Sequence, residues 1–405
     1  MNQLKHYNIL IYGVKIYLFL ILFQWLFSDI LKSNLNNILS IMSLLVPTII
    51  LFINNIKIYT SKIIIVVVFI FGILLLSIMI YSLNVPLKNT LVYSSYKYLE
   101  ILLLFILLNQ LKYEDFLKII LFLRNSFIIV MIPLFFLYII DILNMFNFPN
   151  RFIVFNDYRF GGLIGEPRDC AVFSIMIFAT ILLIKREKFH NLEVLFFIII
   201  IFSTFSNTII LFIPIILLLY LFIKLKFIYK ILFIIFIPIL IFIIFNIMPT
   251  EISLGRFLFD KNYILQLLNN FNDIEIDKVN AVNVRLFLFI KNLQNIPLFG
   301  YGFGSANEFL IIEGFEYGTG AIGFTTLIQD FGIVPFLLYF TYIIYKIKIY
   351  YKIDRKLYLF LVIVFSGFLF MNSPYSKLYL LFFLYFIFIN KQIYYIQKIL
   401  KKEYY

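Results

Sequence analysis

The sequence has few of the side chains on which metal sites, disulfides and imidazole chemistry depend. It contains one cysteine, two histidines and one tryptophan, and charged residues make up 14% of the chain. The single Cys170 excludes an intrachain disulfide and a metal site built from a cysteine cluster. Both histidines, His6 and His190, fall beside segments that we predict to be cytoplasmic, so an outward-facing site has to work without imidazole. We therefore expect no metal and no cofactor.

Apolar residues, in contrast, dominate the composition. Of the 405 residues, 63% are hydrophobic and 20% are aromatic. A water-soluble shell cannot hide that much apolar surface, whereas a lipid bilayer can. The net charge of +13 would suggest a nucleic-acid partner in a soluble protein. Here the lysines lie between apolar runs, where positive charge sets membrane orientation, and we expect no nucleic-acid partner.

The apolar runs predict an all-α, polytopic integral membrane protein with a single membrane domain, residues 1–405. A helical span needs roughly 20 residues. The predicted spans are 8–27, 35–53, 63–83, 91–108, 117–140, 169–184, 192–205, 207–223, 229–248, 324–345, 357–372 and 377–390. The run 192–223 is divided at Ser203–Asn207, where hydroxyl and amide groups can satisfy a turn. No small-residue cleavage site follows Trp25, so the first run is expected to remain as a span.

The lysines predict the orientation of these spans. They gather on alternate loops, which places those loops and both termini in the cytoplasm. The opposite side then carries two long loops, about 141–168 and 249–323. Within the spans, four charged residues are expected to have structural roles, with Lys97 and Glu100 forming a pair and Arg124 reaching toward the cytoplasmic surface. These four are Lys15, Lys97, Glu100 and Arg124.

Arginine is distributed differently from lysine. Five of the eight arginines lie in the two outer loops, against the orientation rule: Arg151, Arg159, Arg168, Arg256 and Arg285. Planar, bidentate binding of phosphate is a usual role of the guanidinium group. The alternative is that long loops escape the rule, which holds best for short ones.

The first outer loop ends in Tyr158-Arg-Phe-Gly-Gly-Leu-Ile-Gly-Glu-Pro-Arg-Asp-Cys170. Gly161, Gly162 and Gly165 allow backbone angles that other residues avoid, and Pro167 predicts the start of a helix with Asp169 in its first turn. A helix start with nearby arginines suits a phosphate. The alternative is an ordinary turn, with its arginines paired to Glu166 or to lipid headgroups.

The second outer loop contains Asn283-Val-Arg-Leu-Phe-Leu-Phe289 and then Ile296-Pro-Leu-Phe-Gly-Tyr-Gly-Phe-Gly304. The first part predicts a short helix that carries Arg285 and ends at Pro297. The glycine-rich part, Gly300-Tyr301-Gly302, lets the backbone approach a ligand or another loop. The alternative is a helix lying flat in the membrane interface. Asp330, deeper in the following segment, is a reserve candidate.

In this order the segments resemble the O-antigen polymerase and ligase superfamily. The first loop resembles its Arg-x-x-Gly-x-x-x-x-Pro motif, and the second resembles its Arg-x-x-x-Trp helix followed by Pro-x-x-Gly-x-Gly. Leu327 to Pro335 resembles its Leu-x-x-x-Gly-hydrophobic-hydrophobic-Gly segment, and Ser203-Thr-Phe-Ser-Asn207 sits where relatives carry a Thr-x-Ser-Arg turn. The likeness covers roughly residues 155 to 345.

The chain departs from these patterns at identifiable positions. Phe289 stands for the tryptophan, Pro335 for the last glycine and Asn207 for the arginine of the turn. The histidine that ligases carry before the Leu-x-x-x-Gly segment is missing. Glu166-Pro167 resembles the form seen in many polymerases, where ligases carry Asn-Pro. These differences favour the polymerase branch, Wzy, over the ligases.

The resemblance implies a function at the outer, periplasmic face of the bacterial inner membrane. A glycan would pass from undecaprenyl diphosphate to the sugar of a new lipid-linked repeat unit, with inversion and without a metal. The implied partners are the lipid-linked oligosaccharide, membrane lipids and a chain-length regulator of the polysaccharide co-polymerase type. A ligase that attaches glycan to lipid A core is the nearest alternative, and a flippase or transporter is the alternative from another class.

The site residues follow from this chemistry. Diphosphate is a good leaving group, so fixed positive charge is the main requirement. Arg159 and Arg285 are the candidates for that role, with Arg168 in support and Gly300, Tyr301 and Gly302 beside the substrate. Glu166 is the candidate base for the acceptor hydroxyl, although it can instead lock an arginine in place.

Overall fold

The structure is a computed structural model that describes part of the chain. The described residues are 8–19, 45–46, 48–50, 99, 101–142, 154–155, 159–162, 167–184, 190–204, 206, 216, 220, 225–226, 229, 251–254, 257–260, 297–300, 323–370, 381–382 and 384–388. The predicted span 63–83, and most of the predicted spans 35–53, 207–223 and 229–248, lie outside these residues.

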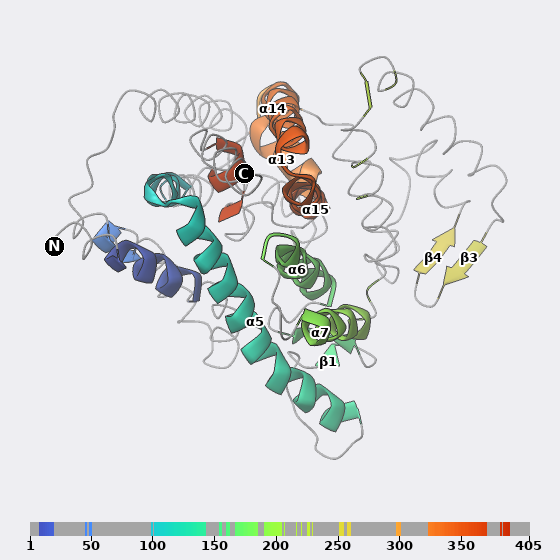
Figure 1. Ribbon diagram of the computed structural model, residues 1–405. Helices are drawn as coiled ribbons and strands as arrows, with labels where there is room; N and C mark the ends of the chain where they lie inside the picture. Colours follow the sequence, from blue (N-terminus) through green and yellow to red (C-terminus); the bar gives the residue numbers. More distant parts are fainter. Residues whose placement is uncertain are drawn as a thin grey trace.

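The described part is mostly helical (Figure 1). Its helices are α5 (Tyr113–Ile142), α6 (Pro167–Ala179), η2 (Thr180–Leu182), α7 (His190–Ser203), α13 (Gly323–Phe331), α14 (Ile333–Ile353), α15 (Arg355–Phe370) and the π-helical η4 (Leu384–Phe388). Shorter apolar helices run from Asn8 to Phe19 and from Ile101 to Gln110. Among the described residues, two helices are long and apolar enough to cross a membrane, Tyr113–Asp141 with 29 residues and Ile333–Ile353 with 21. This supports a membrane protein, and the number of spans stays a prediction.

In the part of the chain that the structure describes, two short antiparallel hairpins accompany the helices, and the sequence patterns did not predict them. β1 (Val154–Phe155) pairs with β2 (Arg159–Phe160), and β3 (Glu251–Leu254) pairs with β4 (Phe257–Asp260). Each hairpin falls within one of the two segments predicted to be outer loops. The first of them carries a candidate site residue, Arg159.

Helices α5, α6 and α7 pack as a bundle in which α5 and α7 run parallel. Near one end, the hydroxyl of Tyr138 on α5 donates to the carbonyl oxygen of Ser203 at 3.5 Å. Further toward the other end, Arg124 of α5 contacts Glu193 in the first turn of α7. Between them, the rings of Phe127 and Phe197 stack with centroids 5.9 Å apart. The break that we predicted at Ser203 is confirmed as the end of α7.

The predicted span 324–345 was wrong in its continuity and its limits. The structure breaks it at Gly332, between α13 and α14, and α14 continues to Ile353. The lysine-rich segment 346–356, predicted to be a loop, is therefore helical except at Asp354. This residue turns the chain: its N–H donates to the Tyr350 carbonyl at 2.9 Å, and its carboxylate accepts from the N–H of Lys356 at 2.8 Å.

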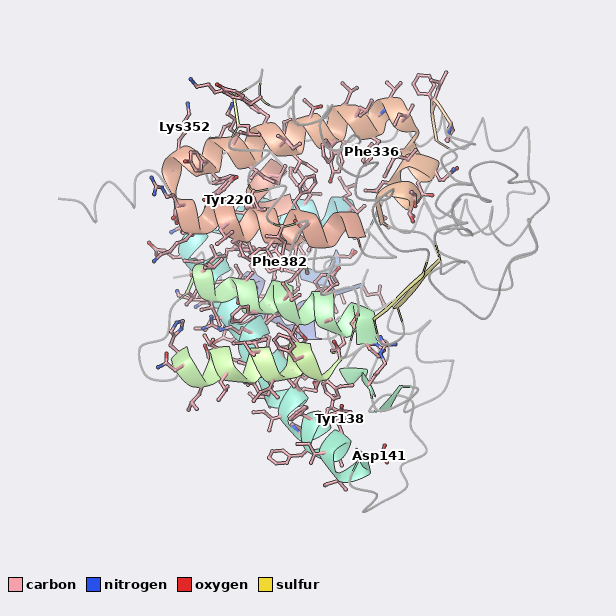
Figure 2. The ribbon with its side chains drawn as sticks, turned by 90° about the vertical axis from the view of Figure 1, so that its right-hand side faces the viewer. Tyr138, Asp141, Tyr220, Phe336, Lys352 and Phe382 are labelled. Atoms are coloured by element: carbon pink, nitrogen blue, oxygen red, sulfur yellow. The ribbon has the colours of Figure 1, made fainter. Side chains whose placement is uncertain are left out.

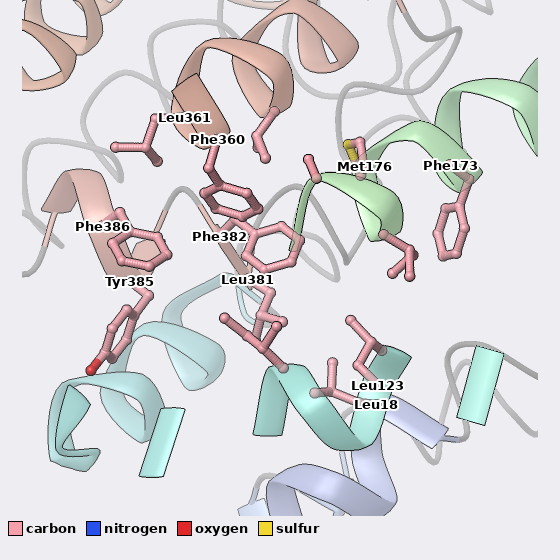
Figure 3. Packing of buried hydrophobic residues seen from close by; sticks show 14 of the residues in the cluster. Leu18, Leu123, Phe173, Met176, Phe360, Leu361, Leu381, Phe382, Tyr385 and Phe386 are labelled. Atoms are coloured by element: carbon pink, nitrogen blue, oxygen red, sulfur yellow. The ribbon is translucent and has the colours of Figure 1, made fainter. Parts of the chain in front are cut away.

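The core is rich in aromatic side chains, because the C-terminal part of the chain packs against the start of α5. Figure 3 shows Phe360, Phe382, Phe386 and Tyr385 gathered between the helices. The rings of Phe116 and Tyr385 stack with centroids 3.5 Å apart, and Phe360 meets Phe382 edge to face at 5.1 Å. Such pairs add about 0.5–1.5 kcal/mol each beyond the area that they bury. The first pair fixes η4 against α5, and the rings of Phe360 and Phe386, 5.9 Å apart, fix η4 against α15.

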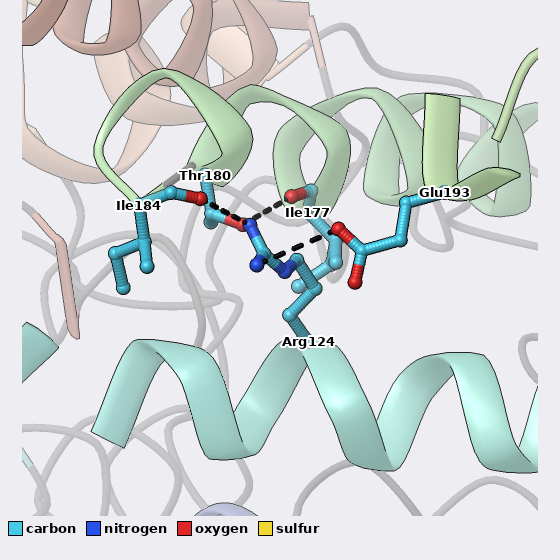
Figure 4. Close-up of polar contacts among 5 residues, drawn as sticks. All are labelled: Arg124, Ile177, Thr180, Ile184 and Glu193. Atoms are coloured by element: carbon cyan, nitrogen blue, oxygen red, sulfur yellow. Dashed lines mark hydrogen bonds and ion pairs between the residues drawn. The ribbon is translucent and has the colours of Figure 1, made fainter. Parts of the chain in front are cut away.

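Arg124 does not reach an aqueous surface, as we had expected it to do. Its side chain is fully buried between α5, η2 and α7 (Figure 4). One guanidinium nitrogen donates to the Ile184 carbonyl at 2.9 Å, and another lies 3.5 Å from the Glu193 carboxylate. A buried charge requires such partners, because leaving it unpaired is costly. The structural role predicted for Arg124 is confirmed, and the expected direction of its side chain was wrong.

The labelled residues near the helix ends lie at two opposite ends of the described bundle. In Figure 2, Lys352 and Tyr220 lie toward one end, and Phe336, Tyr138 and Asp141 lie toward the other. The lysine pattern predicts the same division. Which end faces the cytoplasm stays a prediction.

Candidate functional site

Arg159 lies at the end of helix α7. The residue is half-buried on β2, and its Nε donates a hydrogen bond to the carbonyl oxygen of Thr204 at 3.3 Å. The hydroxyls of Ser203 and Thr204 bond back to the carbonyls of Ile200 and Ile201, at 2.8 and 2.7 Å. The end of a helix carries partial negative charge, which favours a cation there. Two of the segments in the resemblance, the first loop and the Ser203–Asn207 turn, therefore meet at Arg159.

The neighbours of Arg159 hold it against α5 and α6. Phe160 is fully buried, with its ring 5.1 Å from that of Tyr138 and 5.6 Å from that of Phe135. Gly162 has a φ of 56°, and a Cβ there would lie 2.7 Å from the Sγ of Cys170 and 2.9 Å from Cε of Met131. The prediction that a glycine in this loop needs an unusual backbone angle is thus confirmed at Gly162. The tight packing of Phe160 and Gly162 fixes the backbone that follows Arg159.

The rest of the first motif is described only in part. Pro167 begins α6, as its position before the apolar run predicted, and it is buried. Arg168 and Asp169 belong to the first turn of α6, and their side chains lie outside the described residues, as do Gly165 and Glu166. The roles of Arg168 and Glu166 stay predictions.

The second motif is described at Pro297–Gly300, which lies across the break between α13 and α14. The N–H of Ile333 donates to the carbonyl of Pro297 at 2.9 Å, and the N–H of Val334 donates to the carbonyl of Leu298 at 3.3 Å. The two segments are therefore joined through their backbones. The predicted helix before Pro297, with Arg285, lies outside the described residues, as do Tyr301 and Gly302.

Glycines make this close approach feasible. A Cβ on Gly300 would lie 2.2 Å from the carbonyl carbon of Asp330 and 2.3 Å from the backbone nitrogen of Phe331. A Cβ on Gly332 would lie 2.5 Å from the carbonyl oxygen of Leu298 and from the Cα of Phe299. Real Cβ atoms do not approach other atoms this closely, so neither position accepts a larger residue without movement. Two segments that the resemblance singled out thus meet at a pair of glycines.

The contact between Pro297–Gly300 and the α13–α14 break lies beside buried polar residues of α13. Thr325, Thr326, Gln329 and Asp330 are each at most 4% exposed, and Asp330 is fully buried. Ionisable residues enclosed in a membrane protein are rare and commonly functional. Asp330 is our reserve candidate, and its backbone lies against Gly300 of the second motif.

Sequence reasoning missed the contributions of Gly332 and Thr204. A signal for Gly332 existed, because glycine is accepted at the residue before a helix and Pro335 is tolerated in a first helical turn. No sequence signal pointed to the Thr204 carbonyl, since a backbone acceptor is available at every residue. Arg159 contacts the end of α7, whereas Gly300 contacts the end of α13. Arg285 lies outside the described residues.

Among the described residues, no group of three or more His, Cys, Asp or Glu side chains could hold a metal ion. Comparison with known proteins yields no matching family model, no matching curated protein and no matching solved structure.

Proposed function

We propose that this chain is a polysaccharide polymerase of the bacterial inner membrane. It transfers a growing glycan from undecaprenyl diphosphate to the sugar of a new lipid-linked repeat unit at the outer face. One observation carries the proposal: four segments that resemble polymerase motifs meet pairwise. Arg159 binds Thr204, and Gly300 packs on the α13–α14 break at Gly332. Chance likeness of separate short motifs gives no reason for such pairing.

The proposed reaction needs fixed positive charge and a base. The acceptor hydroxyl oxygen attacks the anomeric carbon, the bond from that carbon to the diphosphate oxygen breaks, and undecaprenyl diphosphate leaves with the electron pair. Arg159 and Arg285, supported by Arg168, stabilise the negative charge that develops on the diphosphate. Glu166 takes the proton from the acceptor hydroxyl. The buried carboxylate of Asp330 is the reserve candidate for this base.

The geometry at Arg159 supports its part in this scheme. A guanidinium group that is already held by a helix end needs no reorganisation when a phosphate arrives, which is the condition for strong electrostatic stabilisation. Its hydrogen bond to Thr204 uses Nε, and the residue is half-buried beside Ser203, to whose carbonyl Tyr138 donates.

The two rival functions differ in their products. A ligase would leave single repeats attached to lipid A core. A flippase or transporter would move lipid-linked repeats without joining them, and it would place its polar groups near the membrane midplane. Arg159 instead lies at helix ends, which favours an enzyme acting at the membrane surface.

The test is made in a bacterium whose own polymerase gene is deleted and whose matching repeat-unit pathway is intact. The chain and its Arg159→Ala, Arg285→Ala and Glu166→Ala variants are expressed at equal membrane levels, and the surface polysaccharide is separated on a gel. The proposal predicts a ladder of many repeats with the parent chain and single repeats with the arginine variants. Single repeats with the parent chain would refute polymerisation in that host.

A further inference from the structure

The first turn of α14 has no backbone N–H left for a ligand. A helix begins with N–H groups that lack partners inside the helix. Here the N–H of Ile333 binds the Pro297 carbonyl, and the N–H of Val334 binds the Leu298 carbonyl. The third residue, Pro335, has no N–H, and the fourth, Phe336, donates to the Gly332 carbonyl at 3.1 Å. The second loop therefore caps α14.

These hydrogen bonds explain why a proline fits at position 335, where the chain departs from the glycine of the family pattern. Proline is tolerated in the first turn of a helix because its missing N–H would have no partner in the helix. The two preceding N–H groups bind the carbonyls of Pro297 and Leu298, and the N–H of Phe336 binds the carbonyl of Gly332. A proline at position 335 removes the remaining donor of this turn. The two loop carbonyls thus match the two free N–H groups at the start of α14 in number and position.

Gly332 is the residue on which the match depends. Its backbone angles, φ 87° and ψ 162°, lie in a region that is essentially restricted to glycine. Its missing side chain also makes room for the loop, since a Cβ would lie 2.6 Å from the nitrogen of Gly300. Any side chain at this position is therefore strained in its backbone and also displaces Pro297–Gly300.

We propose that Gly332 is a positioning residue: it fixes Pro297–Gly300 of the second outer loop on the start of α14, and so sets where this segment stands relative to Asp330. The part of this inference that concerns activity rests on the polymerase function proposed above. The docking of the loop does not rest on it, and the two are tested separately.

Docking is measured by disulfide trapping in the purified full-length chain. Leu298 and Val334 are 66% and 40% exposed and are neighbours through the bond from the Val334 N–H to the Leu298 carbonyl, which a cysteine at position 334 retains. The test protein carries Leu298→Cys and Val334→Cys, with Cys170→Ala to remove the native thiol. The control pair is Leu298→Cys with Leu338→Cys, one turn further along α14 at a residue that is 65% exposed.

The readout does not depend on activity. After oxidation, the protein is denatured and cut with a protease specific for glutamate, which cleaves after Glu308, Glu313 and Glu316, between the two cysteines. A disulfide keeps the two peptides together until reduction, and mass spectrometry detects the linked pair. We expect trapping at least tenfold faster than in the control pair, and at least tenfold slower once Gly332→Ala is added. Equal rates in test and control pairs, or an unchanged rate with Gly332→Ala, would overturn the inference.

The activity arm separates positioning from mere stability. Misplacement of a loop by about 1 Å typically costs about 10²-fold in rate. We expect Gly332→Ala to lower elongation by that factor at an unchanged membrane level, and prolonged oxidation of the Gly332→Ala double-cysteine protein to restore it until the disulfide is reduced. Undiminished elongation in Gly332→Ala, or no recovery in the trapped protein, would contradict positioning. If the parent chain elongates nothing, the polymerase proposal fails, and the trapping rates still decide whether Gly332 docks the loop.

Discussion

The Nε of Arg159 donates to the carbonyl oxygen of Thr204 at 3.3 Å, and so joins two segments that lie 45 residues apart. The bond fixes the plane of the guanidinium group at the end of α7. Lysine has a charge but no planar donor at this position of its side chain, so it cannot reproduce the arrangement. Replacing Arg159 with lysine therefore keeps the positive charge and removes the planar geometry, so the two effects can be measured separately.

Arg159→Lys is expected to abolish most polymerisation although it keeps the charge. Removing one preorganised donor to a developing anion typically costs about 10²- to 10³-fold. The measurement is the ladder length and the rate of repeat addition, at equal membrane level. Lys118→Arg, an exchange on the exposed side of α5, is the control and should be silent. A full ladder from Arg159→Lys would show that bidentate geometry is not needed.

Glu193→Ala is expected to destabilise the fold, because it leaves the fully buried Arg124 without its carboxylate partner. Breaking a buried pair typically costs about 3–5 kcal/mol. The thiol of Cys170 is buried, so its reaction with a fluorescent maleimide during heating reports unfolding. The control is Lys118→Ala, which breaks a pair with Asp115 at 2.9 Å in which Lys118 is 65% exposed, and which should lower the unfolding temperature much less than Glu193→Ala does, because the lysine is screened by solvent.

Replacing both members of the buried pair tests the same account from the other side. Arg124→Met with Glu193→Leu removes the charges together and leaves none uncompensated. We expect this double variant to be more stable than Glu193→Ala alone, since apolar replacement of a buried pair is often neutral. A double variant that unfolds at a lower temperature than Glu193→Ala would show that the bond from Arg124 to the Ile184 carbonyl is the more important contact.

Gly162→Ala is expected to destabilise the first loop by about 1–3 kcal/mol, because its φ of 56° and its contact with Cys170 both exclude a side chain. A second substitution, Cys170→Ala, removes the sulfur atom that the new Cβ would meet. Part of the loss should then return, which a double-mutant cycle measured by thermal unfolding in detergent would show. Strict additivity of the two changes would mean that the contact with Cys170 adds nothing, and that the backbone angle and the contact with Met131 account for the cost.

The predicted orientation can be tested at two helix ends. In a Cys170→Ala background, Asp141→Cys near the end of α5 is expected to react with a membrane-impermeant maleimide added to intact spheroplasts. Lys112→Cys, at an exposed residue just before α5, should react only after the membrane is opened. The opposite labelling pattern would invert the topology and place the proposed site in the cytoplasm.

Helices were predictable where the sequence pattern is local. The run 117–140 predicted α5, and the hydroxyl and amide groups at 203–207 predicted the end of α7, because both depend on composition over a few turns. The break at Gly332 was missed, since the apolar run continues through it and only the contact with Pro297 and Leu298 explains it. The helical extension to Ile353 was missed because its lysines resemble a loop.

Pairing between distant segments could not be predicted from the chain alone. The sequence placed Arg159 among the candidates because of its guanidinium group, and Gly300 because a glycine lets the backbone approach another segment closely. Their partners are backbone atoms, the Thr204 carbonyl and the Asp330–Phe331 peptide, which have no identity in a sequence pattern. The burial of Arg124 likewise depends on Glu193, which lies on another helix.

The central claim is that the chain joins repeat units at the expense of a lipid diphosphate. The most direct measurement supplies the purified protein with the matching undecaprenyl diphosphate-linked repeat unit alone and separates the products. The account predicts products with two and more repeats on one lipid, one free undecaprenyl diphosphate per bond formed, and neither product with Arg159→Ala. A substrate that stays at one repeat, with no lipid diphosphate released by a folded protein, would contradict it.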